Sequence, residues 1–292
     1  MSQLTRRDFF VRGSQVAIGT AVGFVALEAL TGSQPAEGRG VQLAPMGQGA
    51  PATATPAASG TPAPTATPTR DPTGWPWKYV KLDPQVVAQK AYDSYYQGGC
   101  MFGAFNGIIV ALRETFGAPY TMVPTMMSRY GEGGGVGWAT LCGALNGSAL
   151  AINLVLKDYA PVVNDLFDWY TKTAFPTFKP ATPKVVISAT SVSNSPLCHV
   201  SVTEWCQAAK VKTESPDRSE RCGRLTADVA AQAVQLLNDY VDGKFKAAYV
   251  VNQSVQTCGV CHLKGGVIED ARGKMDCVQC HEPVSLPTAH PK

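Results

Sequence analysis

Apolar positions recur at helical spacing through most of the chain after residue 74, and this pattern predicts a mainly α-helical protein. Asp83 and Pro84 form an N-cap and first-turn pair for the first helix, which Gly98 and Gly99 should end. The pattern predicts four helices before residue 175, over residues 84–97, 100–117, 138–157 and about 161–174.

The pattern changes beyond residue 180. A β-branched run predicts a short strand over residues 185–189. Ser201, with Glu204 three positions later, is a capping box that should open a short helix. Thr226 should cap a last amphipathic helix that stops before Gly243.

Two of the expected helices contain a matching stretch, FGAFNG at 102–107 and CGALNG at 142–147. Each has two glycines four positions apart, which lets two helix backbones approach closely in a core. Cys100 and Cys142 lie beside these faces, so tight packing would bring their thiols together. The glycine-rich residues 131–137 lack the ending of a phosphate-binding loop and instead predict a close approach of the backbone.

The first 73 residues do not carry a core-forming pattern. Residues 1–34 join the pair Arg6 and Arg7 to a moderately apolar run, the order of a twin-arginine (Tat) export signal. That run is shorter than the ~20 residues of a membrane span, but no clean cleavage site follows it, so an uncleaved anchor is an alternative. Residues 35–73, rich in Pro, Ala and Thr, predict an extended linker. The protein is therefore expected in the periplasm or on the outer face of the cytoplasmic membrane.

The remaining residues should fold as a helical cysteine-containing domain, 74–246, and a loop-rich segment, 247–292. A net charge of +3 over 292 residues is too small to indicate a nucleic-acid partner. Contact with a membrane is expected only through an uncleaved anchor.

The C-terminal segment contains CGVCH and CVQCH, two copies of the attachment motif of c-type haem. Two thiols three positions apart can add to the two vinyl groups of one porphyrin, and the next residue places an imidazole under the iron. The expected thioether anchors are Cys258, Cys261, Cys277 and Cys280. The expected proximal ligands are His262 and His281.

The same four cysteines also fit a zinc pattern, because fifteen residues separate Cys261 from Cys277. A zinc ribbon needs neither histidine, whereas here a histidine follows both cysteine pairs. Export also leads to a compartment where haem c is attached and where unmetallated thiols oxidise. The sequence therefore favours two haem c groups over zinc, and over plain disulfides.

Five further cysteines need an explanation in an exported protein, namely Cys100, Cys142, Cys198, Cys206 and Cys222. Two disulfides with one free thiol, and a four-thiolate iron–sulfur cluster with one cysteine left over, fit their spacing equally well. A Tat signal suits the cluster, because clusters are inserted in the cytoplasm before folded export.

These residues resemble two related protein families. GGCMFGAFNGIIVAL, GEGGGVGWATLCGALNG and the later cysteines are similar to the redox-active family named for its C, GCAxxG, C, C pattern. With both CxxCH motifs added, residues 75–292 resemble the split-Soret cytochromes c. The resemblance implies a dimeric dihaem electron carrier with bis-histidine haems lying close together. It also implies a cluster, [2Fe-2S] favoured, on Cys100, Cys142, Cys198 and Cys222, with Cys206 as an alternative ligand.

The chain has four histidines, so His199 and His290 are left as candidates for the distal positions of two haems. Methionine is the alternative distal ligand, and Met126, Met127 and Met275 are available. Counting and the resemblance both favour bis-histidine ligation. Because His290 lies on a short, proline-rich tail, it should reach the other haem or a haem of a second subunit more easily than its own.

An exported dihaem cytochrome c that carries electrons between redox partner proteins, as a homodimer, is the function that these features predict. Two filled axial positions leave no site for a substrate on the iron. The alternatives are a haem-dependent reductase with an open axial site and a redox sensor.

Overall fold

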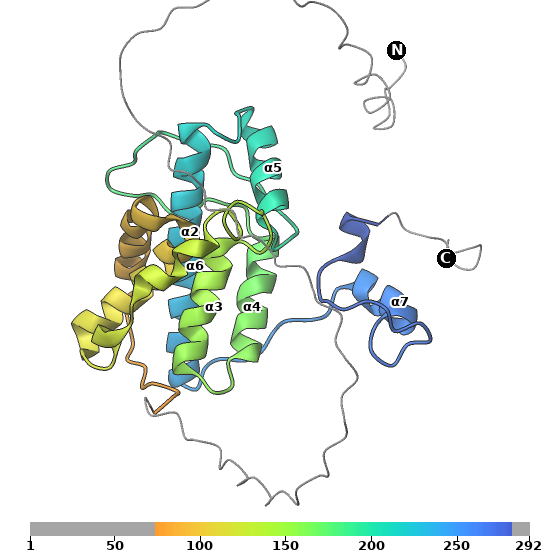
Figure 1. Ribbon diagram of the computed structural model, residues 1–292, viewed down its shortest axis with the longest axis horizontal. Helices are drawn as coiled ribbons and strands as arrows, with labels where there is room; N and C mark the ends of the chain where they lie inside the picture. Colours follow the sequence, from red (N-terminus) through yellow and green to blue (C-terminus); the bar gives the residue numbers. More distant parts are fainter. Residues whose placement is uncertain (1–73, 282–292) are drawn as a thin grey trace, which may run out of the picture. The chain divides into compact units, whose positions relative to one another are not determined.

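The computed structural model describes residues 74–281, and this part of the chain is helical. It contains no β-strand, only isolated bridges that join Leu141 to Leu197 and Phe175 to Ser191. The elements are α2 (Pro84–Phe116), η1 (Tyr120–Met122), η2 (Thr125–Gly131), α3 (Gly143–Val155), α4 (Ala160–Lys172), α5 (Cys198–Ala209), α6 (Pro216–Val241), α7 (Gln253–His262) and η3 (Cys277–Gln279) (Figure 1). The predicted mainly α fold class is confirmed.

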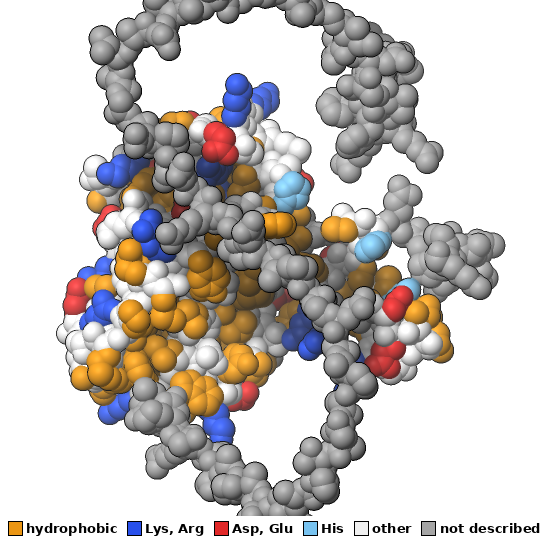
Figure 2. All heavy atoms as spheres, viewed as in Figure 1, with side chains coloured by type: hydrophobic (Ala, Val, Ile, Leu, Met, Phe, Trp, Pro, Cys, Tyr) orange, Lys and Arg blue, Asp and Glu red, His pale blue; other side chains and the backbone are white. Residues whose placement is uncertain are grey.

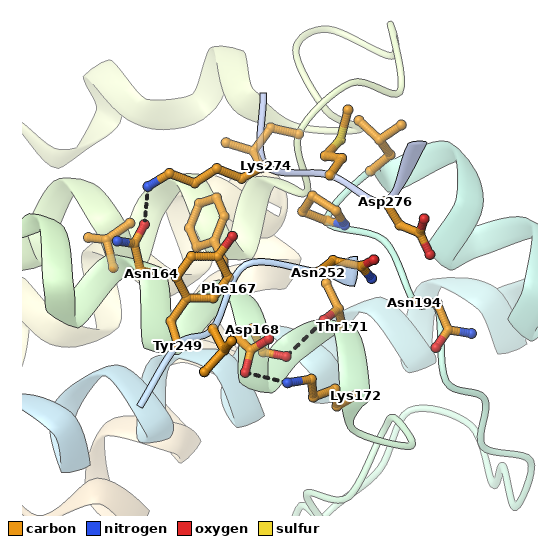
Figure 3. A pocket seen from close by; sticks show the side chains of 16 residues that line it. Asn164, Phe167, Asp168, Thr171, Lys172, Asn194, Tyr249, Asn252, Lys274 and Asp276 are labelled. Atoms are coloured by element: carbon orange, nitrogen blue, oxygen red, sulfur yellow. Dashed lines mark hydrogen bonds and ion pairs between the residues drawn. The ribbon is translucent and has the colours of Figure 1, made fainter. Parts of the chain in front are cut away.

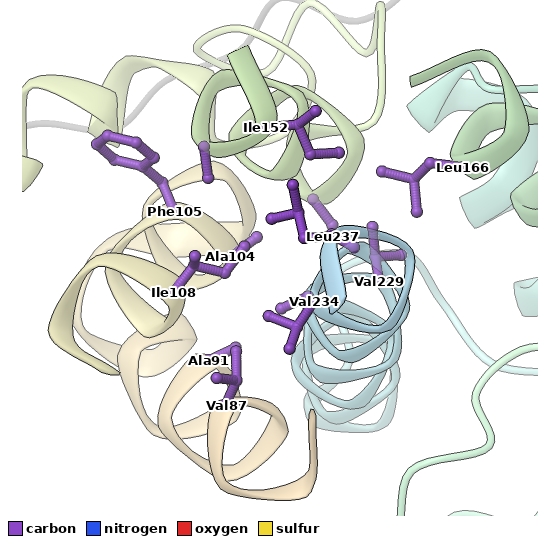
Figure 4. Packing of buried hydrophobic residues seen from close by; sticks show 14 of the residues in the cluster. Val87, Ala91, Ala104, Phe105, Ile108, Ile152, Leu166, Val229, Val234 and Leu237 are labelled. Carbon is purple, nitrogen blue, oxygen red and sulfur yellow. The ribbon is translucent and has the colours of Figure 1, made fainter. Parts of the chain in front are cut away.

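The core forms where α2, α3 and α6 pack together, with α4 covering α6 and α3. Figure 4 shows the apolar side chains of these helices pointing toward one another. The most deeply buried include Ala104 and Ile108 of α2, Ile152 of α3, Leu166 of α4, and Val234 and Leu237 of α6. Their burial, at about 25 cal/mol per Å² of apolar surface, is the main stabilisation of the bundle.

The helix α2 is broken at Gly98 and Gly99, as the sequence predicts. Gly99 has φ 79°, a left-handed value that favours glycine, and Gly98 also departs from helical geometry. The two halves fold back on each other, because a Cβ added at Gly107 would lie 2.7 Å from the backbone nitrogen of Ala91. A Cβ at Gly147 would lie 2.3 Å from the carbonyl oxygen of Met101, so α3 crosses α2 at similarly close range. The expected close approach at these glycines is confirmed.

The expected start of the third helix at residue 138 is wrong, because α3 begins at Gly143. The preceding residues pair with another segment instead: the amide of Cys198 donates to the carbonyl of Thr140 at 2.7 Å, and the amide of Cys142 donates to Pro196 at 2.9 Å. Ala139 has φ 57°, which does not allow a helix to continue through it.

Three further expectations beyond residue 180 are also wrong. The strand over residues 185–189 does not form, and Val186 is 87% exposed, since no partner strand lies beside it in the described chain. Ser201 is not a cap, because α5 begins earlier, at Cys198. Thr226 lies inside α6, whose N-cap is Ser215, with Pro216 in the first turn.

The export signal, the linker and His290 lie outside the described residues. Within residues 74–281, no helix is both long enough and apolar enough to cross a membrane.

Asp228 should make stability depend on pH. Its buried carboxylate accepts hydrogen bonds from the amide of Thr177 at 2.8 Å and from its hydroxyl at 2.5 Å, but burial outweighs them and raises its pKa from 3.8 to about 6. The folded state then binds more protons than the unfolded state between about pH 4 and 6, so stability falls as pH rises through that window. The cost at pH 7 is on the order of 3 kcal/mol.

Asp228→Asn should remove that cost, because the amide stays neutral and can still accept a hydrogen bond from Thr177. Urea unfolding at pH 4 and pH 7 measures the change, and the variant should lose less stability than the natural protein on going to pH 7. The exposed Asp242→Asn is the contrasting variant: hydrogen bonds from Lys81 and Lys244 lower the pKa of Asp242, so its removal should increase, not reduce, the loss of stability on going to pH 7. An unaltered pH dependence in Asp228→Asn would contradict the prediction.

Candidate redox centres

Four of the five cysteines outside the CxxCH motifs come from four different helical elements. Cys100 opens the second half of α2, Cys142 is the N-cap of α3, Cys198 is the first residue of α5 and Cys222 lies in α6. The thiol of Cys100 interacts electrostatically with the other three. The fold thus brings these four candidate ligands into one neighbourhood.

Backbone contacts hold this neighbourhood together. The bridge between Leu141 and Leu197 places the starts of α3 and α5 side by side. Gly143 allows Cys100 to approach, because a Cβ at that position would lie 2.4 Å from the Cys100 sulfur. The glycine-rich loop also reaches this site, with the carbonyl of Gly131 3.9 Å from the Cys100 sulfur.

Burial is the main influence on the pKa of three of these thiols, those of Cys100, Cys142 and Cys198. It raises the pKa of Cys100 and of Cys142, and for Cys100 the neighbouring thiols raise it further. Burial, followed by Cys142 and Cys222, raises the pKa of Cys198 to about 12. The thiols of Cys100, Cys142 and Cys198 are therefore protonated at neutral pH unless a cation replaces their protons, and a bound metal ion would do so.

The donor set suits iron, because four soft thiol ligands on separate rigid helices are typical of iron–thiolate and iron–sulfur sites. Within the described residues, however, no three His, Cys, Asp or Glu side chains already converge on a position that could hold a metal ion. All nine cysteines are free, and none of the disulfides considered from the sequence is formed.

Cys206 is the cysteine outside this group. It lies on α5, eight residues after Cys198, and its buried side chain interacts with Cys222 but with no other cysteine. Its position makes it a weaker candidate for a ligand than the other four.

The first CxxCH motif lies on α7, which places Cys258 and Cys261 one turn apart on the same face and ends at His262. The second motif follows in η3, with Cys280 and His281 just beyond it. The thiols of Cys258 and Cys277 lie within hydrogen-bonding reach of each other, and burial together with Cys258 raises the pKa of Cys277. The two motifs are thus neighbours in space.

A carboxylate orients His262, the first of the two expected proximal histidines. The Nδ1 atom of His262 lies 2.6 Å from a carboxylate oxygen of Asp270. A partner at Nδ1 fixes the tautomer and directs Nε2 toward a metal, the arrangement that ligating histidines usually have.

The C-terminal segment from residue 247 that carries both CxxCH motifs, here called the haem segment, has little core of its own. Val255 is its one buried apolar side chain among the described residues, whereas Val260 is 72% and Val267 88% exposed. Large exposed apolar side chains around two CxxCH motifs fit a bound porphyrin, whose apolar faces would cover them.

A cavity of about 510 Å³ lies between α4 and the haem segment (Figure 3). Phe167 and Tyr249 contribute aromatic walls, Lys172 and Lys274 contribute cations, and Asp276 lies next to Cys277. Its volume is that of a typical cofactor or ligand pocket. Nothing in the sequence marks Phe167 or Tyr249 as lining residues, because their proximity depends on how the C-terminal segment folds back on α4.

The candidate distal ligands are accessible or lie outside the described chain. His199 is exposed in the first turn of α5, next to Cys198. Met126 and Met127 are about half exposed, at 55% and 56%, and Met275 is 47% exposed. None of these residues is buried beside a CxxCH motif, whereas Met275 lies two residues before one.

Comparisons with known proteins identify the family to which this chain is similar. Residues 104–236 match a family described as "Putative redox-active protein (C_GCAxxG_C_C)". The split-Soret cytochrome c of Desulfovibrio desulfuricans is 45% identical over 215 residues, covering 70% of this chain and 77% of the relative. A solved structure of that cytochrome, described as having a novel iron centre, matches with a TM-score of 0.67 and 44% identity, over 72% of this chain and 91% of that one.

Proposed function

This chain belongs to the split-Soret cytochrome c family, and from that premise we propose that it is an exported dihaem electron carrier with a separate iron–sulfur centre. The pair of neighbouring CxxCH motifs, in a segment without a core of its own, carries this proposal. The iron centre of the solved relative supports the second part.

The haem groups would be held by the residues that the motif specifies. Cys258 and Cys261 would bond one porphyrin, and Cys277 and Cys280 the other, while His262 and His281 would bind the irons. Haem c supplies one-electron redox chemistry when bound. The carboxylate of Asp270 would keep His262 oriented and strengthen it as an electron donor to the iron.

The iron–sulfur centre is proposed on Cys100, Cys142, Cys198 and Cys222, with [2Fe-2S] as the favoured type. Their mutual interaction in a partly buried neighbourhood supports this ligand set, and the weaker connection of Cys206 makes it the second choice. Because these thiols do not yet converge, they would have to move together on binding the metal.

Electron transfer is favoured over catalysis because His199 and His290 can supply a distal ligand for each of two haems. A ferrous haem with two protein ligands should not bind carbon monoxide, and its visible spectrum should be low-spin. We expect the purified, dithionite-reduced protein to show no spectral change under carbon monoxide. A high-spin component that binds carbon monoxide would instead favour a reductase with an open axial site.

A homodimer is proposed because residues 122–138 expose several large apolar side chains. The most exposed are Met122, Met126, Met127, Tyr130, Val136 and Trp138, at 55% to 83%. Hydrophobic side chains are also widespread on the face seen in Figure 2. Exposed apolar surface of this extent is typical of an interface with another protein, and a second copy would also give exposed His199 access to a haem that is not its own.

Sedimentation and visible spectroscopy of His199→Ala and His290→Ala test this assembly. We expect at least one variant to convert a low-spin haem to a high-spin one and to weaken the dimer, because a ligand supplied across the interface couples the two. The natural protein is the reference for both measurements. If both variants keep two low-spin haems and an unchanged sedimentation coefficient, neither histidine bridges subunits.

Export by the Tat route is proposed from the paired Arg6 and Arg7, since a protein with a cytoplasmically inserted cluster must cross the membrane folded. The carrier would then act in the periplasm or on the outer face of the cytoplasmic membrane. Other redox proteins would be its partners.

A further inference from the structure

Arg221 has an unusual position for a charged side chain, because it is fully buried with a relative exposure of 2%. It lies on α6 directly before Cys222, one of the four clustered cysteines. One guanidinium nitrogen, Nη2, donates to the hydroxyl of Ser201 at 2.7 Å, and that hydroxyl also accepts a hydrogen bond from Tyr170 at 2.8 Å. The other, Nη1, lies 3.8 Å from the sulfur of Cys222.

Within residues 74–281 no carboxylate forms an ion pair with this buried cation, and its Nε is a buried donor without a hydrogen-bond partner. Asp228, two turns along the same helix, attracts Arg221 electrostatically but hydrogen-bonds to Thr177 instead. An unpaired buried charge costs several kcal/mol, so a compensating negative charge is expected nearby.

Arg224, on the same helix, is a buried arginine whose charge is balanced by a carboxylate. One turn after Arg221, its Nε donates to the carboxylate of Glu220 at 2.7 Å. Both arginines are buried, yet Arg224 has an acidic partner and Arg221 faces thiols. The missing partner of Arg221 is therefore specific to the cysteine neighbourhood.

We propose that Arg221 is the counter-charge of an anionic metal–thiolate centre on Cys100, Cys142, Cys198 and Cys222, and that it raises the reduction potential of that centre. This inference rests on the proposed iron–sulfur function. An iron centre held by four thiolates carries net negative charge, and one added electron makes that charge more negative. A fixed cation beside it therefore stabilises the reduced state more than the oxidised state.

The contacts also explain why arginine is suited to this position. Its planar fork can hold Ser201 with Nη2 while Nη1 lies near the sulfur of Cys222, and charged donors make the stronger hydrogen bonds to thiolates. Tyr170 and Ser201 together fix the orientation of the guanidinium. Arg221 is thus a positioning and charge-balancing residue rather than a ligand.

The test is an EPR-monitored redox titration of the non-haem centre in the full-length, haem-loaded protein. Arg221→Met should lower the reduction potential by at least about 59 mV. For a one-electron couple, a shift of that size lowers the ratio of reduced to oxidised centre at a given potential about tenfold. Arg221→Lys keeps the charge and should stay close to the natural potential. Arg221→Gln is a second neutral variant, for use if Arg221→Met does not fold.

Arg224→Met is the matched control, because it removes a buried guanidinium that has its own carboxylate partner. It should reduce thermal stability but leave the potential unchanged. An unchanged potential in both neutral Arg221 variants, with only a loss of stability, would overturn the proposal and reduce Arg221 to a packing residue. An equal shift in the Lys variant would overturn it as well.

Iron analysis of the natural protein distinguishes a failure of this inference from a failure of the iron–sulfur proposal on which it rests. If it contains no iron beyond its haems, the iron–sulfur proposal fails, and the role of Arg221 fails with it. If it contains the extra iron but the Arg221 variants do not shift the potential, the inference about Arg221 alone is wrong.

Discussion

Replacing both Cys277 and Cys280 with alanine should yield a protein with one covalently bound haem instead of two. Each porphyrin is expected to bond only to the two thiols of its own motif, and Cys258 and Cys261 lie on a separate element, α7, which has its own N-cap at Asn252. The second haem therefore has no remaining covalent anchor, whereas the first keeps both. Intact-protein mass spectrometry, with haem-stained denaturing gels, measures the difference directly.

Cys206→Ala is the control for this experiment, since Cys206 lies far from either motif in sequence and should leave both haems attached. Loss of haem from the natural protein in acidified acetone would contradict covalent attachment altogether. Two retained haems in the double variant would mean that the second motif does not bind haem, and bound zinc in place of haem would restore the zinc interpretation.

The second large effect is expected at the cysteine cluster. Cys142→Ser should abolish binding of the non-haem iron. Loss of a residue that only supports a metal ligand lowers the metal affinity ~10–100-fold, and loss of a ligand itself should lower it at least as much. Cys142 is well placed for this test: it is buried, and its thiol interacts with Cys100, Cys198 and the hydroxyl of Tyr170. Total iron, haem and acid-labile sulfide per chain in anaerobically prepared protein give the occupancy.

Cys206→Ser is the matched control, because Cys206 is buried like Cys142 yet interacts only with Cys222 among the cysteines. It should keep the natural iron and sulfide content. Equal losses in the two serine variants would show that Cys206 is a ligand in place of one of the four. Absent sulfide together with two mapped disulfides in the natural protein would favour a purely structural role for these cysteines.

Local sequence was enough to predict those features that depend on a few neighbouring residues. The CxxCH motifs specify their chemistry within five residues, and Gly98 with Gly99 breaks α2 because only glycine readily adopts the φ of 79° found there. Periodicity identified the helical class and most helices for the same reason. It failed at Trp138, where backbone pairing between residues 140–142 and 196–198 replaced a helical turn.

The roles of Ser201 and Arg221 were decided by packing alone. Ser201 has the spacing of a capping box, yet α5 begins earlier and its hydroxyl instead links Tyr170 to Arg221 in the interior. No periodicity distinguishes Arg221, which has no ion pair in the described structure, from Arg224, which pairs with Glu220. Each arginine has an acidic residue four positions earlier on α6, Asp217 and Glu220, but only Glu220 forms the ion pair, so local spacing does not decide which buried cation has a partner.

The sequence by itself determined that this protein is helical and carries two haem-attachment motifs, because those properties are encoded in short, contiguous patterns. Only the tertiary structure decided that Cys100, Cys142, Cys198 and Cys222 gather in one partly buried neighbourhood and that Cys206 interacts with only one of them. The physical reason is that thiols spread over more than a hundred residues meet only through the packing of α2, α3 and α6 and through the backbone pairing that places the start of α5 beside that of α3. That packing is set by close contacts such as Gly143 against the Cys100 sulfur and Gly147 against the Met101 carbonyl, which spacing along the chain does not specify.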